Sequence, residues 1–195
     1  MQPTSILDFL LKHVEERPSD TAALEKIHGA YQPVTWEQLW DRARAVSAGL
    51  VALGLDATEH ACILSNTRLD WCVLDLGILA AGAVTIPIYP SNLPDECAYI
   101  IENSGARVIF TEDATQTQKI LEVKAQLQDQ LLAVVQMTGA PPTEDPWVKT
   151  FDDFVDGATD EHRGALDERR ASLHRDAILT IIYTSGTTGR PKGVV

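Results

Sequence analysis

The sequence predicts an α/β protein in which a mostly parallel sheet is flanked by helices. Short apolar runs rich in β-branched residues alternate with segments of helical periodicity along most of the 195 residues. Strands that alternate with helices of roughly ten to fifteen residues form crossover units, and crossover units give parallel strands. The composition, 45% hydrophobic and 23% charged, is that of an ordinary globular protein and excludes disorder, collagen and coiled coil.

The expected elements follow one another in a regular order as far as Met137. Helices are assigned where apolar residues recur at three- and four-residue spacing, and strands where a short apolar run lies between turn signals. The order is a helix over 5–16, a strand over 21–28, a turn over 29–33, a helix from 35 to 54, a strand over 60–65, a helix over 68–81, a strand over 84–88, a helix over 94–103, a strand over 107–111, a helix over 115–130 and a strand over 131–137.

Capping and breaking residues fix several of these boundaries. Pro18 ends the first helix, because proline does not continue a helix. Thr35 followed by Gln38 is a capping-box pattern and predicts the start of the second helix. Gly54 closes that helix and Gly105 closes the helix over 94–103, since glycine accepts the left-handed conformation at a helix C-terminus.

The regular alternation of strands and helices does not continue in the last third of the chain. Residues 138–146 contain three prolines, a glycine and two acids, which is typical of a surface loop. The charged stretch over 152–175 predicts exposed, peripheral helices. An apolar, β-branched run over 177–183 predicts a buried strand that leads directly into a loop over 184–193.

Charge divides the chain into two regions. The sequence carries 16 basic and 28 acidic residues, a formal charge of -12, which excludes a general nucleic-acid binder because such proteins need a basic face. The last acid is Asp176, and only Arg190 and Lys192 are charged beyond it. Residues 1–176 therefore hold 14 basic against 28 acidic residues, and residues 177–195 carry +2. A positive end on an acidic body indicates one anion-binding site.

The cysteines and the N-terminus indicate a reduced, cytoplasmic setting. Cys62, Cys72 and Cys97 are odd in number and lack C-x-x-C spacing, so neither a disulfide framework nor a zinc site is expected. We expect Cys62 and Cys72 to be buried thiols rather than nucleophiles. The N-terminus lacks a signal-peptide pattern, and glycines and prolines interrupt the uncharged stretch between Asp75 and Asp95, which predicts buried core rather than a membrane span.

The loop over 183–193, Tyr-Thr-Ser-Gly-Thr-Thr-Gly-Arg-Pro-Lys-Gly, has the composition of a phosphate-binding loop. Glycines let successive N–H groups converge on an anion, hydroxyls add donors, and Lys192 adds a point charge. It is not a Walker loop, because Gly193 and a strand-like run follow the lysine, so a glycine-rich hairpin is expected. A plain turn is the alternative on composition alone. The candidate cofactor-binding residues are Thr184, Ser185, Gly186, Thr187, Thr188, Gly189 and Lys192.

The full string over 183–194 is similar to the signature of the AMP-forming acyl-CoA synthetases, adenylation domains and luciferases. Two further stretches resemble that adenylate-forming superfamily, Leu-Ala-Ala-Gly-Ala-Val-Thr-Ile-Pro-Ile-Tyr-Pro over 79–90 and Val-Thr-Trp over 34–36. Within it, Ile-Tyr-Pro over 88–90 with Ala-Tyr-Ile-Ile-Glu-Asn-Ser over 98–104 is most similar to bacterial long-chain fatty-acid CoA ligases.

The resemblance implies a two-step reaction. A fatty-acid carboxylate attacks the α-phosphate of ATP and releases pyrophosphate, and the thiol of coenzyme A then displaces AMP. ATP, Mg²⁺ and coenzyme A are the implied cofactors or co-substrates, and Lys192 with the loop would hold the β- and γ-phosphates. The resemblance makes residues 1–176 the N-terminal α/β subdomain and residues 177–195 the opening of the next part of the nucleotide-binding core. It leaves contact with the inner membrane face and homo-oligomer formation open.

Other motifs of the superfamily follow its phosphate loop, and this chain ends two residues after Gly193. We therefore expect an N-terminal fragment that is inactive alone, with no catalytic residue assigned and with Thr-Glu pairs such as Thr111-Glu112 as coincidences. Two alternatives remain: an adenylating enzyme that acts on aryl acids or loads a carrier protein, and a non-catalytic binding module.

Overall fold

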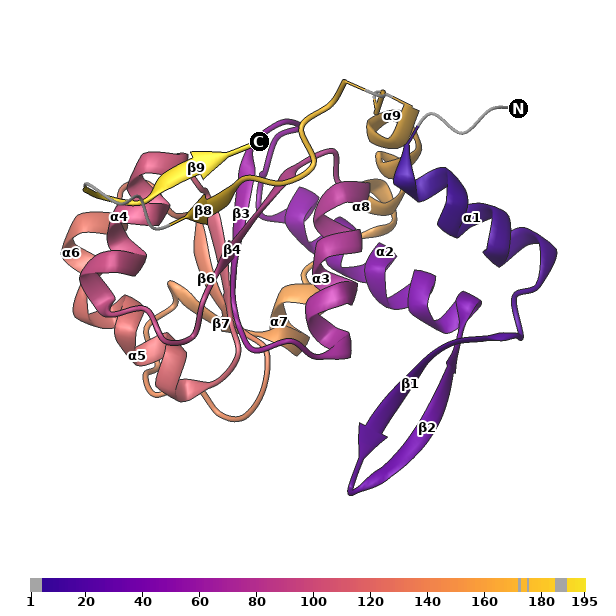
Figure 1. The fold of residues 1–195 in the computed structure, drawn as a ribbon, viewed down its shortest axis with the longest axis horizontal. Helices are drawn as coiled ribbons and strands as arrows, with labels where there is room; N and C mark the ends of the chain where they lie inside the picture. Colours follow the sequence, from indigo (N-terminus) through magenta and orange to yellow (C-terminus); the bar gives the residue numbers. More distant parts are fainter. Residues whose placement is uncertain (1–4, 172, 175, 185–188) are drawn as a thin grey trace.

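The computed structural model describes residues 5–171, 173, 174, 176–184 and 189–195, and the strands form three sheets (Figure 1). The helices are α1 (Ile6–Glu16), α2 (Trp36–Ala52), α3 (Leu69–Ala80), α4 (Pro94–Ser104), α5 (Ala114–Glu122), α6 (Lys124–Leu127), α7 (Phe151–Asp156), α8 (Asp160–Gly164) and α9 (Leu166–Ala171). The strands are β1 (Thr21–Ile27), β2 (Ala30–Thr35), β3 (His60–Leu64), β4 (Val84–Ile88), β5 (Val108–Thr111), β6 (Ala133–Gln136), β7 (Val148–Thr150), β8 (Ile182–Thr184) and β9 (Lys192–Val194).

The central sheet has five strands in the order β4-β3-β5-β6-β7, and every neighbouring pair is parallel. Cys62 of β3 lies opposite Ile86 of β4 on one side and Ile109 of β5 on the other. This confirms the α/β class and the mostly parallel sheet. The chain runs outward from β3 to β4 and then crosses to β5 on the other side of β3, so the strand order reverses between β3 and β5. Ligands of open α/β sheets bind at the carboxyl ends of the strands flanking such a point.

Two hydrophobic cores lie on the two faces of this sheet, because successive strand residues point to opposite faces. Ile63 and Phe110 face the core that includes α1, α2, α3 and α7, whereas Cys62 and Ile109 face the core that includes α4, α5 and α6. In Figure 1 the two groups of helices lie to the right and left of the sheet. A parallel sheet covered on both faces explains why its strands are continuous apolar runs.

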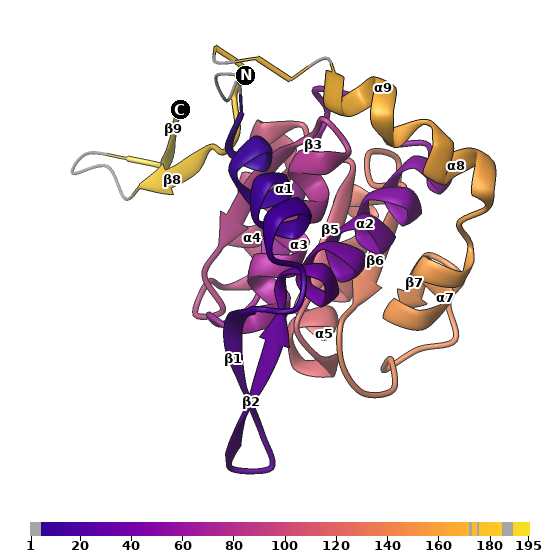
Figure 2. The same ribbon diagram turned by 90° about the vertical axis from the view of Figure 1, so that its right-hand side faces the viewer.

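The expected turn over 29–33 is wrong, because most of these residues belong to β2. This strand pairs antiparallel with β1, and the hairpin projects from the body (Figures 1 and 2). The tight turn lies at His28 and Gly29, whose φ angles are 49° and 85°. Positive φ at both central residues suits the right-handed twist of a two-residue hairpin. Pro33 hides the strand in the sequence, since proline is accepted only where no neighbouring strand needs its N–H.

Two further expectations need correction in the second half of the sheet. The single helix expected over 115–130 is divided at Val123, whose φ of -110° and ψ of 15° separate α5 from α6. Strand β7 was not expected, because its three residues follow the proline-rich loop. It pairs with β6 through Val134 and Val148, which shows that a very short strand can form where a sheet edge offers partners.

The stretch expected to hold exposed, peripheral helices contains one helix that closes a core. Phe154 of α7 is 2% exposed, and its ring packs edge-on against Phe110 with centroids 5.4 Å apart. A Cβ atom added at Gly49 of α2 would lie 2.6 Å from the Phe154 ring, so the helix approaches α2 closely at a residue without a side chain. The expectation is therefore wrong for α7. The expectation of an exposed helix is confirmed for α8, none of whose residues is buried.

The apolar run over 177–183 is not a continuous buried strand. Only Ile182–Thr184 form β8, and Ile182 is 44% exposed. Upstream of it, Thr180 forms a parallel bridge to Thr85 on the outer edge of β4, where the Thr85 N–H donates to Leu179 O at 3.0 Å. The run is only partly covered because β4 is the last strand of the central sheet and the run lies along its free edge.

The cysteines divide by location. Cys62 and Cys97 are buried, and burial raises the pKa of both thiols, to about 11 for Cys97. The expectation that Cys72 is buried is wrong, since it is exposed on α3. Over the described ranges, no helix combines the length and the apolar character needed to cross a membrane.

Candidate functional site

The predicted phosphate loop is carried by an antiparallel hairpin. Strands β8 and β9 pair with Thr184 opposite Lys192 and Tyr183 opposite Gly193. This confirms that the chain resumes as a strand after the loop. Of the candidate residues, Thr184, Gly189 and Lys192 are described by the structure, whereas Ser185, Gly186, Thr187 and Thr188 lie outside the described residues.

Thr184 and Lys192 lie at the base of the loop, Gly189 lies within it, and all three face solvent. Thr184, Gly189 and Lys192 are all exposed. Because directly opposed residues of an antiparallel pair point to the same face, the Thr184 hydroxyl and the Lys192 ammonium are presented on one side of the ladder. None of the ion pairs formed within the described ranges involves Lys192. Its positive charge is therefore available to an anion.

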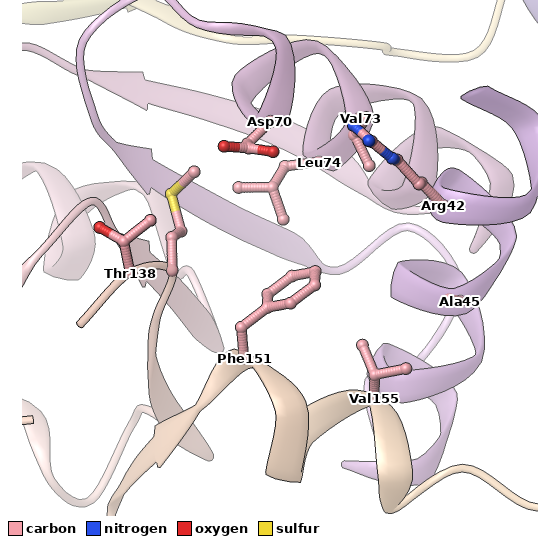
Figure 3. Close-up of a pocket in the computed structure, with 9 residues that line it drawn as sticks. Arg42, Ala45, Asp70, Val73, Leu74, Thr138, Phe151 and Val155 are labelled. Carbon is pink, nitrogen blue, oxygen red and sulfur yellow. The ribbon is translucent and has the colours of Figure 1, made fainter. Parts of the chain in front are cut away.

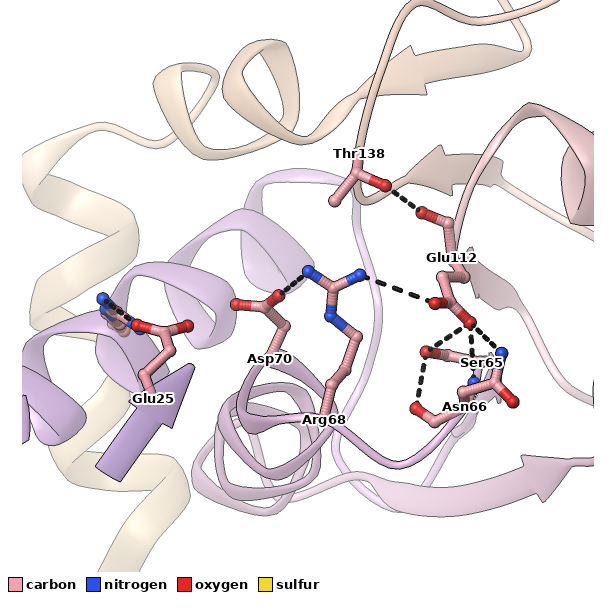
Figure 4. A network of polar contacts seen from close by, with 8 residues as sticks. Glu25, Ser65, Asn66, Arg68, Asp70, Glu112 and Thr138 are labelled. Carbon is pink, nitrogen blue, oxygen red and sulfur yellow. Dashed lines mark hydrogen bonds and ion pairs between the residues drawn. The ribbon is translucent and has the colours of Figure 1, made fainter. Parts of the chain in front are cut away.

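A polar network joins the carboxyl ends of β3 and β5, where the strand order reverses (Figure 4). Glu112 follows β5, and its Oε2 accepts hydrogen bonds from the backbone N–H of Asn66 at 2.7 Å and from Asn66 Nδ2 at 2.8 Å. Arg68 bridges two acids, with 2.7 Å to Asp70 and 3.6 Å to Glu112. The Thr138 hydroxyl donates to the backbone carbonyl of Glu112 at 2.8 Å.

Sequence reasoning missed this network, because it treated Thr111-Glu112 as a coincidental Thr-Glu pair. The signal that could have found it is the position of the polar residues, since Glu112 comes directly after β5 and Asn66 comes two residues after β3, both buried strands. The partners of Glu112 satisfy its carboxylate within the chain. The network therefore ties two strand ends together and holds the loops at the reversal point.

Glu112 should make stability depend on pH. Burial alone would raise the pKa of this carboxyl, but the hydrogen bonds from Asn66 and the charge of Arg68 outweigh it and lower the pKa below the ordinary value. A carboxyl whose pKa is lower in the folded state than in the unfolded state stabilises the fold at pH values above its unfolded-state pKa of about 4.3. This stabilisation is lost as the pH falls through the folded-state pKa. We expect Glu112→Gln to lower the free energy of unfolding by about 1 to 2 kcal/mol at pH 7.

Urea unfolding of both proteins from pH 7 down to about pH 3 measures this effect. The difference between wild type and Glu112→Gln should shrink as the pH falls. Glu144→Gln is the matched control, because Glu144 also follows a threonine but is exposed, and its difference should stay within about 0.5 kcal/mol at every pH. A Glu112 difference that does not change with pH would contradict the role assigned to the carboxylate.

Two cavities lie near the polar network and the β8–β9 hairpin. One of about 330 Å³ lies among α2, α3, α7 and the chain after β6, with a largely apolar wall and with Arg42 and Asp70 as its charged residues (Figure 3). Its other lining residues are Ala45, Val73, Leu74, Met137, Thr138, Phe151 and Val155. The second cavity, of about 260 Å³, is lined by Asn66 after β3, Tyr89 after β4 and Ile182 of β8, so it adjoins the hairpin.

Comparison with known proteins connects the hairpin to a family of enzymes. Residues 10–195 match the family described as AMP-binding enzyme. The chain is 31% identical over 189 residues to the long-chain-fatty-acid–CoA ligase FadD15 of Mycobacterium bovis, an alignment that covers 97% of this chain and 30% of that protein. It is 30% identical over 195 residues to the long-chain-fatty-acid–CoA ligase ACSBG2 of Xenopus laevis, covering 100% of this chain and 26% of that protein.

Solved structures show the same fold. The anthranilate CoA ligase AuaEII, crystallised with anthranoyl-AMP, superposes with a TM-score of 0.81 at 26% identity, over 96% of this chain and 33% of that one. A Mycobacterium tuberculosis fatty acyl CoA synthetase superposes with a TM-score of 0.62 at 24% identity, over 95% and 33%. The chain thus spans about a third or less of each of these four proteins. On the family match, which extends over nearly its whole length, this chain belongs to the AMP-binding enzymes.

Proposed function

We propose that the chain is the N-terminal part of an ATP-dependent long-chain fatty-acid CoA ligase. The observation that carries the proposal is the β8–β9 hairpin, which presents the exposed Lys192 opposite the hydroxyl of Thr184 at the base of a loop of glycines and hydroxyls. The substrate class is supported by the relatives named as long-chain-fatty-acid–CoA ligases, which align along 97% or more of this chain.

The proposed reaction has two steps. A carboxylate oxygen of the fatty acid attacks the α-phosphorus of ATP, the bond to the β-phosphate oxygen breaks, and pyrophosphate leaves. The coenzyme A sulfur then attacks the acyl carbonyl, the thiol proton is lost, and AMP leaves. Negative charge builds on the β- and γ-phosphates in the first step, so a fixed cation and fixed donors around these groups lower its barrier.

Lys192 is assigned to the β- and γ-phosphates. Its strand position fixes the direction of the side chain, while the glycines of the loop let backbone N–H groups approach the same phosphates. Magnesium would enter with the phosphates of ATP and neutralise part of their charge. Magnesium is a hard cation that prefers oxygen ligands, and the hydroxyl oxygen of Thr184 is of this kind.

The other parts of the proposal concern the setting of the enzyme. We place residues 1–176 in an N-terminal α/β subdomain and residues 177–195 in the next part of the nucleotide-binding core. The enzyme is proposed to be cytoplasmic. Contact with the inner membrane face and homo-oligomer formation remain predictions.

An aryl-acid CoA ligase is the second candidate function. The observation that favours it is the superposition on the anthranilate CoA ligase, whose TM-score of 0.81 exceeds the 0.62 of the fatty acyl CoA synthetase. Both candidates use the same adenylation chemistry and differ in the acid that they accept.

Identification of the thioester product separates the two candidates. The full-length enzyme proposed to contain this chain would be incubated with ATP, Mg²⁺, coenzyme A and long-chain, short-chain, aromatic or amino acids, and the products analysed by mass spectrometry. Long-chain acyl-CoA as the main product supports the first candidate, and an aryl-CoA supports the second. An adenylate that forms without any CoA thioester would favour transfer to a carrier protein and reject both.

A further inference from the structure

Helix α4 holds the second strand of the hairpin at the residue before Lys192. The hydroxyl of Tyr99 on α4 donates to the backbone carbonyl of Pro191 at 3.0 Å. The guanidinium carbon of Arg190 lies 5.1 Å from the centroid of the Tyr99 ring, within the range of a cation–π contact. Tyr99 therefore fixes the orientation of the peptide group that joins Pro191 to Lys192.

The same helix holds the first strand at the residue before Thr184. The hydroxyl of Tyr183 donates to Oδ1 of Asn103 at 2.7 Å. Burial raises the pKa of Tyr183, so this hydroxyl stays protonated and keeps donating at neutral pH. Asn103 is four residues after Tyr99 on α4, which places both side chains on one face of the helix.

The two anchors also contact each other. The rings of Tyr99 and Tyr183 meet edge to face, with centroids 6.5 Å apart and an interplanar angle of 87°. Gly193 lies opposite Tyr183 in the hairpin, and a Cβ atom added to it would lie 2.8 Å from Cγ2 of Ile181 and 3.3 Å from Cζ of Tyr183. The absence of a side chain at Gly193 thus leaves room for the Tyr183 ring to reach α4.

These contacts lie on both sides of the loop. One anchor immediately precedes Thr184 and the other immediately precedes Lys192. Ordering a chain segment around a ligand costs conformational entropy, and the cost on binding is smaller where the residues at both ends of the segment are already held. The expected benefit is tighter binding of the triphosphate and a better placed lysine.

We propose that Tyr99 and Asn103 are positioning residues that hold the two ends of the phosphate loop for the pyrophosphate-releasing step. This proposal rests on the proposed adenylation function. It also gives a physical role to the Ala-Tyr-Ile-Ile-Glu-Asn-Ser segment over 98–104, because the tyrosine and the asparagine of that segment are the two residues that reach the hairpin.

Kinetics of ATP–pyrophosphate exchange in the full-length enzyme test the proposal. Tyr99→Phe removes only the hydrogen bond to Pro191 and should raise the KM for ATP by about three- to tenfold. Tyr99→Leu also removes the ring under Arg190 and should raise it by about ten- to hundredfold. The KM for the acid and the thermal unfolding temperature of Tyr99→Phe should stay at the wild-type values, which a merely structural role would not predict.

Asn103 offers a rescue experiment. Asn103→Leu leaves the Tyr183 hydroxyl without its acceptor and should raise the KM for ATP by about three- to tenfold, whereas Asn103→Asp keeps an acceptor oxygen and should restore most of the loss. Glu102→Gln is the control, because Glu102 is exposed on the same helix. An ATP KM within about twofold of wild type in both Tyr99→Leu and Asn103→Leu would overturn the proposal.

Hydrogen exchange separates failure of this proposal from failure of the proposed function. Amide exchange of residues 181–184, 189, 190 and 192–194 can be measured whether or not the enzyme adenylates an acid. Faster exchange in Tyr99→Leu than in Glu102→Gln is expected, and equal exchange would overturn the anchoring. A wild-type enzyme without any pyrophosphate exchange would instead reject the adenylation function on which the positioning role rests.

Discussion

Replacement of Lys192 by methionine is expected to slow acid-dependent ATP–pyrophosphate exchange in the full-length enzyme by about 10²- to 10³-fold. Methionine keeps an unbranched, flexible side chain but removes the charge. Lys192 is exposed at the base of the loop, opposite Thr184, and forms no ion pair within the described ranges. The loss should therefore come from the phosphates and not from the fold.

Two measurements distinguish a lost contact with the phosphates from a damaged fold. The free energy of unfolding of Lys192→Met should stay within about 0.5 kcal/mol of wild type, as for other exposed substitutions. Lys12→Met is the matched control, since Lys12 is exposed on α1, and α1 lies on the other side of the molecule from the β8–β9 hairpin in Figure 1. The pyrophosphate exchange rate of this variant should equal that of wild type. A Lys192→Met enzyme that exchanges pyrophosphate within about threefold of wild type would contradict the assigned role.

Replacement of Phe154 by alanine is expected to lower the free energy of unfolding by about 3 to 5 kcal/mol. The ring is 2% exposed and fills the space between Phe110 of β5, Phe151 of α7 and the bare backbone at Gly49 of α2. Alanine would remove the ring and leave a cavity that two rigid elements, a central strand and a long helix, cannot close. The effect should be among the largest of any single substitution in this chain.

Urea unfolding monitored by circular dichroism measures the change. Asp156→Ala, an exposed substitution at the end of the same helix, is the control and should change the free energy by less than about 0.5 kcal/mol. Equal stabilities of Phe154→Ala and Asp156→Ala would show that α7 is peripheral, as the charge pattern of the sequence indicates, and that the contacts with Phe110 contribute nothing.

Local sequence signals were sufficient for strands β3 to β6 of the central sheet and for the position of the loop. Strands β3 to β6 were predicted because each is a short apolar run buried on both faces. The start of α2 was predicted because Thr35 and Gln38 form the capping box that the structure contains, with 3.2 Å from the Gln38 N–H to the Thr35 hydroxyl. Helix capping and strand burial act within a few residues, so they can be read along the chain.

Features that depend on distant partners could not be predicted in this way. Phe154 is buried because α7 meets Gly49, more than 100 residues earlier in the chain. Strand β2 is hidden by Pro33, and β7 exists only because β6 offers a free edge. The charged residues around α7 obscured its apolar side in the sequence.

The candidate site also contains residues that local sequence signals predict and residues that depend on distant partners. Lys192 and Thr184 were predicted from the composition of the loop and from the resemblance of the string that contains them. The anchors were not predicted, because Tyr99 and Pro191 are 92 residues apart and Tyr183 and Asn103 are 80 apart. The Asn66–Glu112 contacts span 46 residues. Only the fold brings these residues together.

ATP–pyrophosphate exchange with and without a long-chain fatty acid, in the full-length enzyme and in this chain alone, tests the central claim most directly. We predict exchange that requires the acid in the full-length enzyme and no exchange in the 195-residue chain, which spans 30% of a long-chain ligase relative. Full-length enzyme that does not exchange pyrophosphate with any carboxylic acid would contradict adenylation and favour a non-catalytic binding module.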